Sequence, residues 1–368
     1  MSKQIVLLPG DGIGKEIMES AKFVLHAIGE EFGHSFTFHE EAIGGDAIDR
    51  HGVPLPERTI EACKRADALL LGAVGGPKWN SQPAHNRPEQ GLLGIRKEME
   101  LFANLRPVKG SSPLLHASPL KEEIIKDSDI LIIRELTGGL YFGKPSERRE
   151  NGNVVVDTLY YRRDEMERII DKAFETASKR KRHLTSVDKA NVLESSRMWR
   201  EIVEEKSEAY PDVTVEHVLV DAAAMKLITQ PTAFDVIVTE NLFGDILSDE
   251  ASVLTGSLGM LPSASLRTDG VGLYEPVHGS APDIAGKGIA NPLGMILSTA
   301  MMLRYSFQME EEATEIERAV DHVLELGYHT PDLSIEGGKQ VGTKEMTELI
   351  VDHITVKSIR DSICSIYV

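Results

Sequence analysis

The apolar residues of this chain follow two alternating patterns. Short runs rich in leucine and β-branched residues are separated by longer segments in which apolar residues recur every three or four positions, which predicts an α/β architecture. The predicted strands are Gln4–Leu8, Ser35–Glu40, Ala68–Gly72, Ile130–Glu135, His183–Val187, Val213–Leu219 and Asp235–Thr239. The predicted helices are Ile13–Gly29, Glu57–Lys64, Gly91–Leu101, Arg163–Ser178, Ser195–Lys206, Phe243–Leu254 and Pro292–Phe307, and the last long amphipathic segment runs through Ala319–Leu326.

Length indicates two lobes. The chain has 368 residues, whereas single hydrophobic cores stop growing at about 250–300 residues. No internal repeat and no low-complexity linker separates the predicted elements. Two lobes without a linker suggest a discontinuous domain, in which the chain crosses between the lobes more than once.

Charge and cysteine content restrict the class of protein. Lys and Arg number 40 against 58 Asp and Glu, a net charge of −18, which argues against a nucleic-acid or anionic-membrane binder. An anionic ligand therefore needs a local cluster of cations. The only cysteines, Cys63 and Cys364, are too few for a disulfide framework. The apolar run Ile5–Leu8 ends at once in Pro-Gly-Asp, and no stretch approaches the roughly 20 apolar residues of a membrane span. We expect a cytoplasmic protein.

One segment, Arg148–Tyr161, predicts a hairpin. Asn151-Gly152 is a hairpin turn signal, and the apolar run Val154–Val156 lies beside it. A hairpin of this size is marginal alone. It fits equally an edge hairpin on its own sheet and an arm that pairs with another subunit.

The first glycine-rich segment is IVLLPGDGIGKEI. A predicted strand runs into Gly10, Gly12 and Gly14 before a helix, as in a dinucleotide fingerprint. The spacing is G-x-G-x-G rather than G-x-G-x-x-G, and Pro9 stiffens the turn. This pattern favours a tight turn that lines a cleft, with a classical Rossmann site as the alternative.

The segment ENLFGDILSDEAS places two carboxylates on one helix face. Asp245 and Asp249 are four residues apart, a spacing that suits a hard divalent cation which takes further ligands from water and substrate. The alternative is a solvated acidic face. The apolar flanks Leu242–Phe243 and Ile246–Leu247 favour the metal, because like charges in such surroundings are costly without a cation.

Three arginines suggest a pocket for a dicarboxylate. Arg96 lies in a predicted helix, Arg106 follows in LRP, and Arg134 ends an apolar strand. A guanidinium inside or at the end of a buried strand needs an anionic partner, and its paired N–H groups match the two oxygens of a carboxylate. For any single arginine, the alternative is a structural ion pair with Glu98, Glu100 or Glu135.

Lys189 and Tyr141 are candidates for proton transfer. Lys189 follows a predicted strand, and a strand-end lysine becomes a general base if its surroundings lower its pKa. Tyr141 lies in a glycine-rich loop, TGGLYFGKPSERR, that could bring its hydroxyl to a ligand. The alternatives are a solvated lysine and a packed tyrosine that anchors its loop.

A second long loop, YEPVHGSAPDIAGKGIANP, is too irregular to be a mere connection. It ends at Asn291-Pro292, where a helix begins with proline in its first turn. Its backbone N–H groups, together with His278 and Asp283, could surround a nucleotide.

Together these segments resemble the metal-dependent β-decarboxylating dehydrogenases, the family of isocitrate and isopropylmalate dehydrogenases. The resemblance covers essentially the whole chain and is most specific in NLFGDILSDEASVLTGSLGM and EPVHGSAPDIAGKGIANP. It implies a two-lobed fold that is not a classical Rossmann fold, with residues 1–101 and 256–368 in a first, nucleotide-side domain and 102–255 in a second, dimerisation domain. It also implies that 148–161 is an intersubunit β-arm.

The resemblance further implies roles for individual residues in a homodimer with shared active sites. Tyr141 and Lys189 would be catalytic, with Lys189 contributed by the partner subunit. Substrate would be bound by Leu92, Arg96, Arg106, Arg134 and Asp221, and Mg²⁺ or Mn²⁺ by Asp221, Asp245 and Asp249, again across the dimer interface. NAD would lie at Gly76, Glu89, His278, Gly279, Ser280, Ala281, Asp283 and Asn291.

Within that family, RPEQGLLGIRKEMELFANLRP and GGLYFGKPSERR resemble the members that oxidise isopropylmalate. Leu92 would offer an apolar wall to an isopropyl group, and Glu89 on the same helix face would repel a third substrate carboxylate. Asp283 would accept ribose hydroxyls and repel a 2′-phosphate, which favours NAD over NADP. We therefore expect oxidative decarboxylation of 3-isopropylmalate to 4-methyl-2-oxopentanoate, in leucine biosynthesis.

The rivals within the family are dehydrogenases of isocitrate, homoisocitrate or tartrate, which would differ around Leu92. Outside the family, they are a non-redox lyase and a binding protein that has lost catalysis. The intact set of Lys189, Tyr141 and aspartates argues against the loss of catalysis.

Overall fold

The computed structural model describes residues 2–110 and 112–366, with side chains as far as residue 355. The chain divides into two compact units. Unit 1 comprises Met1–Met99, Ser111–Ser118 and Gly256–Val368, and unit 2 comprises Glu100–Gly110 and Pro119–Thr255. The segment Ser111–Ser118 thus belongs to unit 1, whereas the sequence places it in the second domain.

Unit 1 is built on five strands in the order β2-β1-β3-β12-β11. Their bounds are β1 Lys3–Gly10, β2 Phe36–Glu40, β3 Ala68–Ala73, β11 Pro262–Leu266 and β12 Gly272–Pro276. Strands β2, β1, β3 and β12 run parallel to one another, and β11 pairs antiparallel with β12. Ile5 to Leu8 on β1 are at most 1% exposed. Such a continuous apolar run is typical of a parallel strand covered on both faces.

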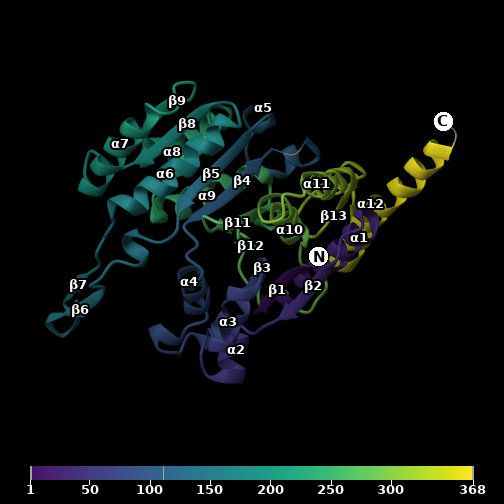
Figure 1. Ribbon diagram of the computed structural model, residues 1–368, viewed down its shortest axis with the longest axis horizontal. Helices are drawn as coiled ribbons and strands as arrows, with labels where there is room; N and C mark the ends of the chain where they lie inside the picture. Colours follow the sequence, from purple (N-terminus) through teal and green to yellow (C-terminus); the bar gives the residue numbers. More distant parts are fainter. Residues whose placement is uncertain (1, 111, 367–368) are drawn as a thin grey trace. The chain divides into compact units, whose positions relative to one another are not determined.

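Seven helices of unit 1 lie in the described part of the chain. They are α1 Gly14–Phe32, α2 Gly44–His51, α3 Glu57–Arg65, α4 Glu89–Glu98, α10 Leu293–Tyr305, α11 Glu310–Glu325 and α12 Thr343–Ile366. Helix α10 is apolar on nearly all sides and packs against α1 and α11, while α12 covers α1 (Figure 1). A helix that is apolar all round is a core helix. A short pair, β13 Tyr328–His329 and β14 Lys339–Gln340, completes the unit.

Unit 2 has its own five strands in the order β4-β5-β10-β8-β9. They are β4 Ala103–Lys109, β5 Asp129–Glu135, β8 His183–Asp188, β9 Thr214–Leu219 and β10 Val236–Thr239. Only β4 is antiparallel to its neighbour among these described strands. The helices are α5 Glu122–Ile125, α6 Arg163–Ser178, α7 Glu194–Ser207, α8 Val220–Thr229 and α9 Asn241–Ala251. Helices α6 and α7 pack together beside the sheet (Figure 1).

The hairpin predicted around Asn151-Gly152 is present. Strand β6 Glu147–Arg149 pairs with β7 Val154–Val156, and Asn151 and Gly152 both have positive φ, 57° and 92°. Val155 is 57% exposed. The hairpin forms its own two-stranded sheet, and its intersubunit role stays a prediction.

The α/β class and all seven predicted strands are confirmed. The hydrophobic pattern missed β4, β11 and β12, whose sequences ANLRPVK, PSASL and GLYEP are polar or contain proline. It missed α2, α8 and α12 as well, so the segment at 319–326 is not the last long helix but the second half of α11. Helix α4 ends at Glu98 rather than Leu101, because Glu100 adopts a left-handed φ of 54°.

Cys63, on α3, is buried in unit 1, and this burial raises the pKa of its thiol to about 12. The side chain of Cys364 lies outside the described residues. Among the helices that the structure describes, none has the length and apolar character needed to span a bilayer.

Candidate active site

The candidate residues of unit 2 collect at one edge of its sheet. Strands β5, β10, β8 and β9 are parallel, so their carboxyl ends share an edge, where open α/β sheets bind ligands. Arg134 lies near the end of β5, Lys189 directly follows β8, and helix α9 begins with Asn241 after β10. Asp221 stands in the first turn of α8, after β9.

The antiparallel pairing of β4 with β5 brings two of the predicted arginines to one face. Asn104 lies opposite Arg134, and Arg106 follows two residues along β4. Because side chains alternate along a strand, these three point to the same side. Arg106 and Arg134 are only 7% and 2% exposed. The Arg106 Nε donates to Asn104 Oδ1 at 2.8 Å.

Helix α9 supplies the acceptors for Arg134. The Arg134 Nε and Nη2 donate to Asn241 Oδ1 at 3.1 and 2.8 Å, and Nη1 donates to Asp245 Oδ1. Asn241 and Asp245 are four residues apart and so lie one turn above each other on the helix. The predicted strand-end arginine is thus anchored by a neutral amide and by a candidate metal ligand.

Arg106 contacts the next turn of the same helix. Its Nη1 donates to Ser248 Oγ at 2.6 Å and to Asp249 Oδ1 at 3.3 Å, and its Nη2 lies 3.5 Å from Asp245 Oδ1. Two guanidinium groups therefore face two carboxylates. The suggested ion pair with Glu135 is wrong: the Glu135 carboxylate accepts from the N–H groups of Thr137 and Gly138.

Gly244 explains how α9 comes so close to β5. A Cβ placed on Gly244 would lie 2.7 Å from Cγ and 2.8 Å from Cβ of Arg134. Any side chain there would push the helix off the strand. The glycine in NLFGD is therefore required by the packing of Arg134.

Tyr141 joins the same cluster. Its hydroxyl donates to Asp245 Oδ2, and the Arg134 guanidinium carbon lies 5.3 Å from its ring centroid. Burial, and then the Asp245 carboxylate, raise the pKa of Tyr141 above its usual value of 10, although Arg134 opposes the shift. The hydroxyl is thus protonated at neutral pH and able to donate a proton, while 39% of the residue is exposed to an incoming ligand.

Asp245 and Asp249 fit the donor chemistry of a hard divalent ion. Desolvation raises the pKa of Asp249, Arg106 lowers it, and the like charge of Asp245 raises it further. A cation would relieve that repulsion. Within the described residues, however, no group of three or more His, Cys, Asp or Glu side chains is placed to hold a metal. One chain offers two carboxylates, so further ligands must come from elsewhere.

Lys189 and Asp221 form a separate pair. The Lys189 Nζ lies 2.5 Å from Asp221 Oδ1, and this hydrogen bond lowers the pKa of Asp221. The backbone N–H of Lys189 donates to Ser196 Oγ at 3.0 Å. In the strand order β5-β10-β8-β9, Lys189 lies two strands from Arg134, about 10 Å at the usual strand spacing. Within one chain, Lys189 and Asp221 are thus each other's ion-pair partners.

Arg96 belongs to unit 1. It lies on α4, is 8% exposed, and its Nη2 donates to Oε1 of Glu275, on β12, at 2.6 Å. Its partner is thus not Glu98 or Glu100. The Arg96 Nε is buried and no described residue accepts a hydrogen bond from it. A buried guanidinium with an unused donor fits the predicted role as a carboxylate ligand.

The predicted helix face that carries Glu89 and Leu92 begins α4. Leu92 is half-buried, while Glu89 is exposed and lies against a glycine turn: a Cβ on Gly75 would lie 2.9 Å from Glu89 Oε1. The next residue, Gly76, has a φ of 151°. The structure therefore brings Glu89 beside Gly75–Gly76, one of the predicted cofactor contacts.

The two glycine-rich segments of unit 1 contact each other. The Ile13 N–H donates to the Ser280 carbonyl at 2.8 Å, and Ser280 Oγ donates to Gly75 O at 2.9 Å. At Gly12, with φ 57°, a Cβ would lie 2.0 Å from Ser280 O. In a classical Rossmann site, a backbone N–H at this turn would bind a pyrophosphate. Here the Ile13 N–H is already bound by the Ser280 carbonyl. This decides between the two interpretations in favour of the cleft-lining turn.

The remaining predicted nucleotide contacts lie along the same loop. Gly279 and Asp283 are exposed, and Ala281 is left-handed with φ 38°. Burial lowers the pKa of His278, so its ring is neutral at pH 7. Asn291 is engaged within the protein: its Nδ2 donates to Asp332 Oδ2 at 3.0 Å, and its Oδ1 accepts the Leu293 N–H at 2.9 Å.

Comparisons with known proteins identify the family of this chain. A profile of the isocitrate/isopropylmalate dehydrogenase family matches residues 4–350. The chain belongs to this family. It is 71% identical, over the full length of both chains, to a 3-isopropylmalate dehydrogenase of Oceanobacillus iheyensis. It is 59% identical to a 3-isopropylmalate dehydrogenase of Bacillus subtilis, over 98% of this chain and all of the relative.

A solved structure supports the same assignment. The isocitrate dehydrogenase of Methylococcus capsulatus matches with a TM-score of 0.83 and 36% identity, over 96% of this chain and 99% of that one. The resemblance read from the motifs is therefore confirmed. The chain is a decarboxylating dehydrogenase of the isocitrate/isopropylmalate family.

Within this family framework, several important residues were missed by sequence reasoning. Asp11 is the clearest: its carboxylate accepts backbone N–H groups from Gly45, Asp46 and Gly75 at 2.7–2.8 Å, which joins its own turn to the first turn of α2 and to the loop after β3. A buried aspartate between two glycines was a readable signal. Asn104, Asn241, Ser248 and Glu275, which hold the three arginines, carried no comparable signal.

Proposed function

We propose that this dehydrogenase is a cytoplasmic homodimer that oxidises 3-isopropylmalate at C2 with NAD and removes the β-carboxylate. The product would be 4-methyl-2-oxopentanoate, which makes this the oxidative step of leucine biosynthesis. The observation that carries the proposal is the convergence of Arg106, Arg134 and Tyr141 on the Asp245 carboxylate. The relatives named 3-isopropylmalate dehydrogenase support the choice of substrate.

Two groups complete the chemistry. Mg²⁺ or Mn²⁺ held by Asp245, Asp249 and Asp221 of a second subunit would lower the pKa of the 2-hydroxyl and stabilise negative charge on that oxygen. NAD, bound by the His278–Asn291 loop with Gly76 and Glu89, would accept the hydride. The acidic face of α9 and the neutral, backbone-rich loop suit these two groups respectively.

The protein's own residues bind the substrate and move its protons. Arg106 and Arg134, with Arg96, would bind the two carboxylates of the dianion, and their burial strengthens each charge-assisted hydrogen bond. Lys189 would take the 2-hydroxyl proton. Tyr141 would return a proton to carbon after carbon dioxide leaves; the raised pKa of its hydroxyl keeps that proton available.

The position of the base supports shared active sites. Lys189 and Asp221 pair with each other two and three strands away from the Arg134 strand. Within its own chain, the Lys189 ammonium is directed to Asp221. We therefore assign Lys189 and Asp221 of each subunit to the site of the other.

Two side chains would select the substrate. The half-buried Leu92 would contact the isopropyl group, whose burial is worth about 2 kcal/mol. The exposed Glu89 would repel the third carboxylate of isocitrate or homoisocitrate and face the positive nicotinamide ring. Asp283 would favour NAD over NADP by accepting the ribose hydroxyls.

A panel assay tests the proposal. NAD reduction is measured with Mg²⁺ and, in turn, 3-isopropylmalate, isocitrate, homoisocitrate and tartrate. We expect 3-isopropylmalate to give the highest kcat/KM, at least about tenfold above the others, which is the effect of 1.4 kcal/mol of apolar contact and charge repulsion. A higher value with another acid would contradict the choice of substrate, and product formation without NAD would contradict the redox reaction.

A further inference from the structure

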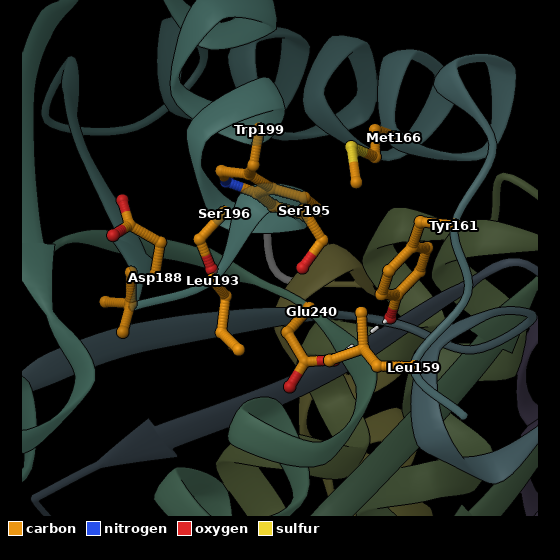
Figure 2. A pocket seen from close by; sticks show the side chains of 10 residues that line it. Leu159, Tyr161, Met166, Asp188, Leu193, Ser195, Ser196, Trp199 and Glu240 are labelled. Atoms are coloured by element: carbon orange, nitrogen blue, oxygen red, sulfur yellow. Dashed lines mark hydrogen bonds between the residues drawn. The ribbon is translucent and has the colours of Figure 1, made fainter. Parts of the chain in front are cut away.

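The first turn of α9 is held in unit 2 by a tyrosine that the proposed reaction does not use. Tyr161 stands between β7 and α6. Its hydroxyl accepts the backbone N–H of Asn241 at 3.0 Å and donates to Glu240 Oε2 at 3.2 Å. Figure 2 shows the Tyr161 hydroxyl turned toward the Glu240 carboxylate, beside a small cavity.

Glu240 divides its two oxygens between the helix and the tyrosine. It is the residue before α9, and Oε1 accepts the N–H of Phe243 at 3.1 Å, which caps the helix. Oε2 accepts the Tyr161 hydroxyl. Glu240 is 7% exposed. The cap and the tyrosine together fix the position at which α9 begins.

That position determines where Asn241 points. The Asn241 Oδ1 accepts both Nε and Nη2 of Arg134, and its Nδ2 donates to the carbonyl of Gly138 at 3.2 Å. Asn241 is 1% exposed. One buried amide therefore orients the substrate-binding arginine and restrains the loop that leads to Tyr141.

The Tyr161 ring packs under that same loop. A Cβ on Gly138 would lie 2.3 Å from Cε1 of Tyr161, and a Cβ on Gly139 would lie 2.8 Å from its hydroxyl oxygen. The Gly139 N–H also donates to Tyr160 O at 2.9 Å. Tyr161 therefore contacts the start of α9 and the backbone two residues before Tyr141 at the same time.

We propose that Tyr161 and Glu240 are positioning residues for the reaction: through Asn241 they orient the Arg134 guanidinium, and through Gly138–Gly139 they place the Tyr141 hydroxyl. This inference rests on the proposed function. Neither residue is among those that we propose to contact the substrate or the cofactor. Their effect is confined to the substrate binding by Arg134 and the proton donation by Tyr141.

Tyr161→Phe tests the inference, because it keeps the ring that packs on Gly138–Gly139 and removes only the hydroxyl. We expect kcat/KM for 3-isopropylmalate to fall about tenfold, as for the loss of one or two buried hydrogen bonds. The KM for NAD should stay within about twofold. Tyr210→Phe is the matched control, since Tyr210 stacks on Phe174 elsewhere in unit 2, and it should leave both parameters unchanged.

Glu240 provides the second arm, which remains informative should Tyr161→Phe fail to fold. Glu240→Gln keeps an oxygen for the Phe243 N–H and a polar group for the tyrosine, so it should retain activity within about threefold. Glu240→Ala loses both contacts and should show the tenfold loss. Rescue by glutamine, with the NAD parameters constant, would support positioning.

The outcomes separate the two proposals. No turnover of 3-isopropylmalate by the wild-type protein would contradict the proposed function, and this inference with it. Wild-type turnover with unchanged kcat/KM in Tyr161→Phe or Glu240→Ala would contradict the inference alone. Equal losses for 3-isopropylmalate and NAD, with a lowered Tm, would also contradict it, because they indicate general loosening.

Discussion

The two units build their candidate sites from different materials. In unit 2, ionised side chains on regular elements face one another: Arg106 on β4 and Arg134 on β5 contact Asp245 and Asp249 on α9. In unit 1, the candidate site is held together mainly by backbone groups of loops. For example, the Ile13 N–H donates to the Ser280 carbonyl.

The difference matches what each unit is proposed to bind. A cluster in which buried guanidinium groups face more exposed carboxylates can exchange its internal partners for a dianion and a divalent cation, because each guanidinium and each carboxylate then has a ligand of opposite sign. A loop fixed by backbone hydrogen bonds and a left-handed glycine instead offers a preformed backbone surface, which suits a large cofactor. Substitutions in the charged cluster of unit 2 should therefore change substrate handling, and those in the glycine-rich loops of unit 1 should change cofactor handling.

The largest expected effect comes from the proposed base in unit 2. Lys189→Met should lower kcat about a thousandfold, since general-base catalysis contributes about 10²–10⁴. Its dissociation constant for NAD, measured by titration calorimetry, should not change. Lys179→Met, at an exposed position after α6, is the control. A variant that keeps full activity would rule out Lys189 as the base.

Tyr141→Phe should slow the reaction about a hundredfold at the step after hydride transfer. A single-turnover experiment that follows NADH and carbon dioxide separately should show NADH forming at nearly the wild-type rate and the final product forming slowly. Because burial and Asp245 raise the pKa of Tyr141 above 10, the hydroxyl keeps its proton as pH rises. The wild-type kcat should thus show no loss assignable to Tyr141 between pH 7 and about pH 9. An unchanged overall rate in the variant would exclude the acid role.

In unit 1, the corresponding break is Gly12→Ala. The new Cβ would overlap the Ser280 carbonyl and occupy a positive φ, a strain of about 1–3 kcal/mol. We expect the KM for NAD to rise about tenfold while the dissociation constant for 3-isopropylmalate in the absence of NAD stays constant. Gly33→Ala, also at positive φ but with no atom near the added Cβ, controls for backbone strain alone. Equal effects on the KM for NAD and on the dissociation constant for 3-isopropylmalate would contradict the proposed difference between the two units.

The smallest expected effect concerns the choice between cofactors. Asp283→Lys should shift the ratio of kcat/KM for NAD over NADP by about fivefold to tenfold toward NADP, through loss of repulsion and gain of attraction for the 2′-phosphate. Asp283 is exposed, so the change should leave Tm within about one degree. A constant ratio would show that Asp283 does not face the ribose.

The same contrast explains what could be predicted from the sequence. Arg134 and Asp245 stand out because an ionised group at the end of an apolar strand, or on an apolar helix, requires a partner. Arg106 was noted as a further arginine for the same pocket, and Tyr141 for its glycine-rich loop. The structure brings these four together. Periodicity alone also identified α9 as the helix that carries the carboxylates.

Partners that depend on tertiary register could not be read. Arg96 pairs with Glu275, which is 179 residues away in the chain and lies on a strand, GLYEP, with no clear strand pattern. Asn241 was passed over because a neutral amide carries no charge signal, although it binds Arg134 at two atoms. Asp11 joins its own turn to the first turn of α2 and to the loop after β3, and no local pattern encodes the proximity of these segments.

The central claim is that the carboxylates of α9 hold a divalent ion next to the two arginines of unit 2. Mn²⁺ binding by the wild-type protein and by Asp249→Asn, followed by electron paramagnetic resonance in the presence of 3-isopropylmalate, tests it directly. We expect one Mn²⁺ per chain in the wild type and an affinity at least about tenfold weaker in the variant, which loses one of the carboxylates. Identical titration curves for the two proteins would contradict the account.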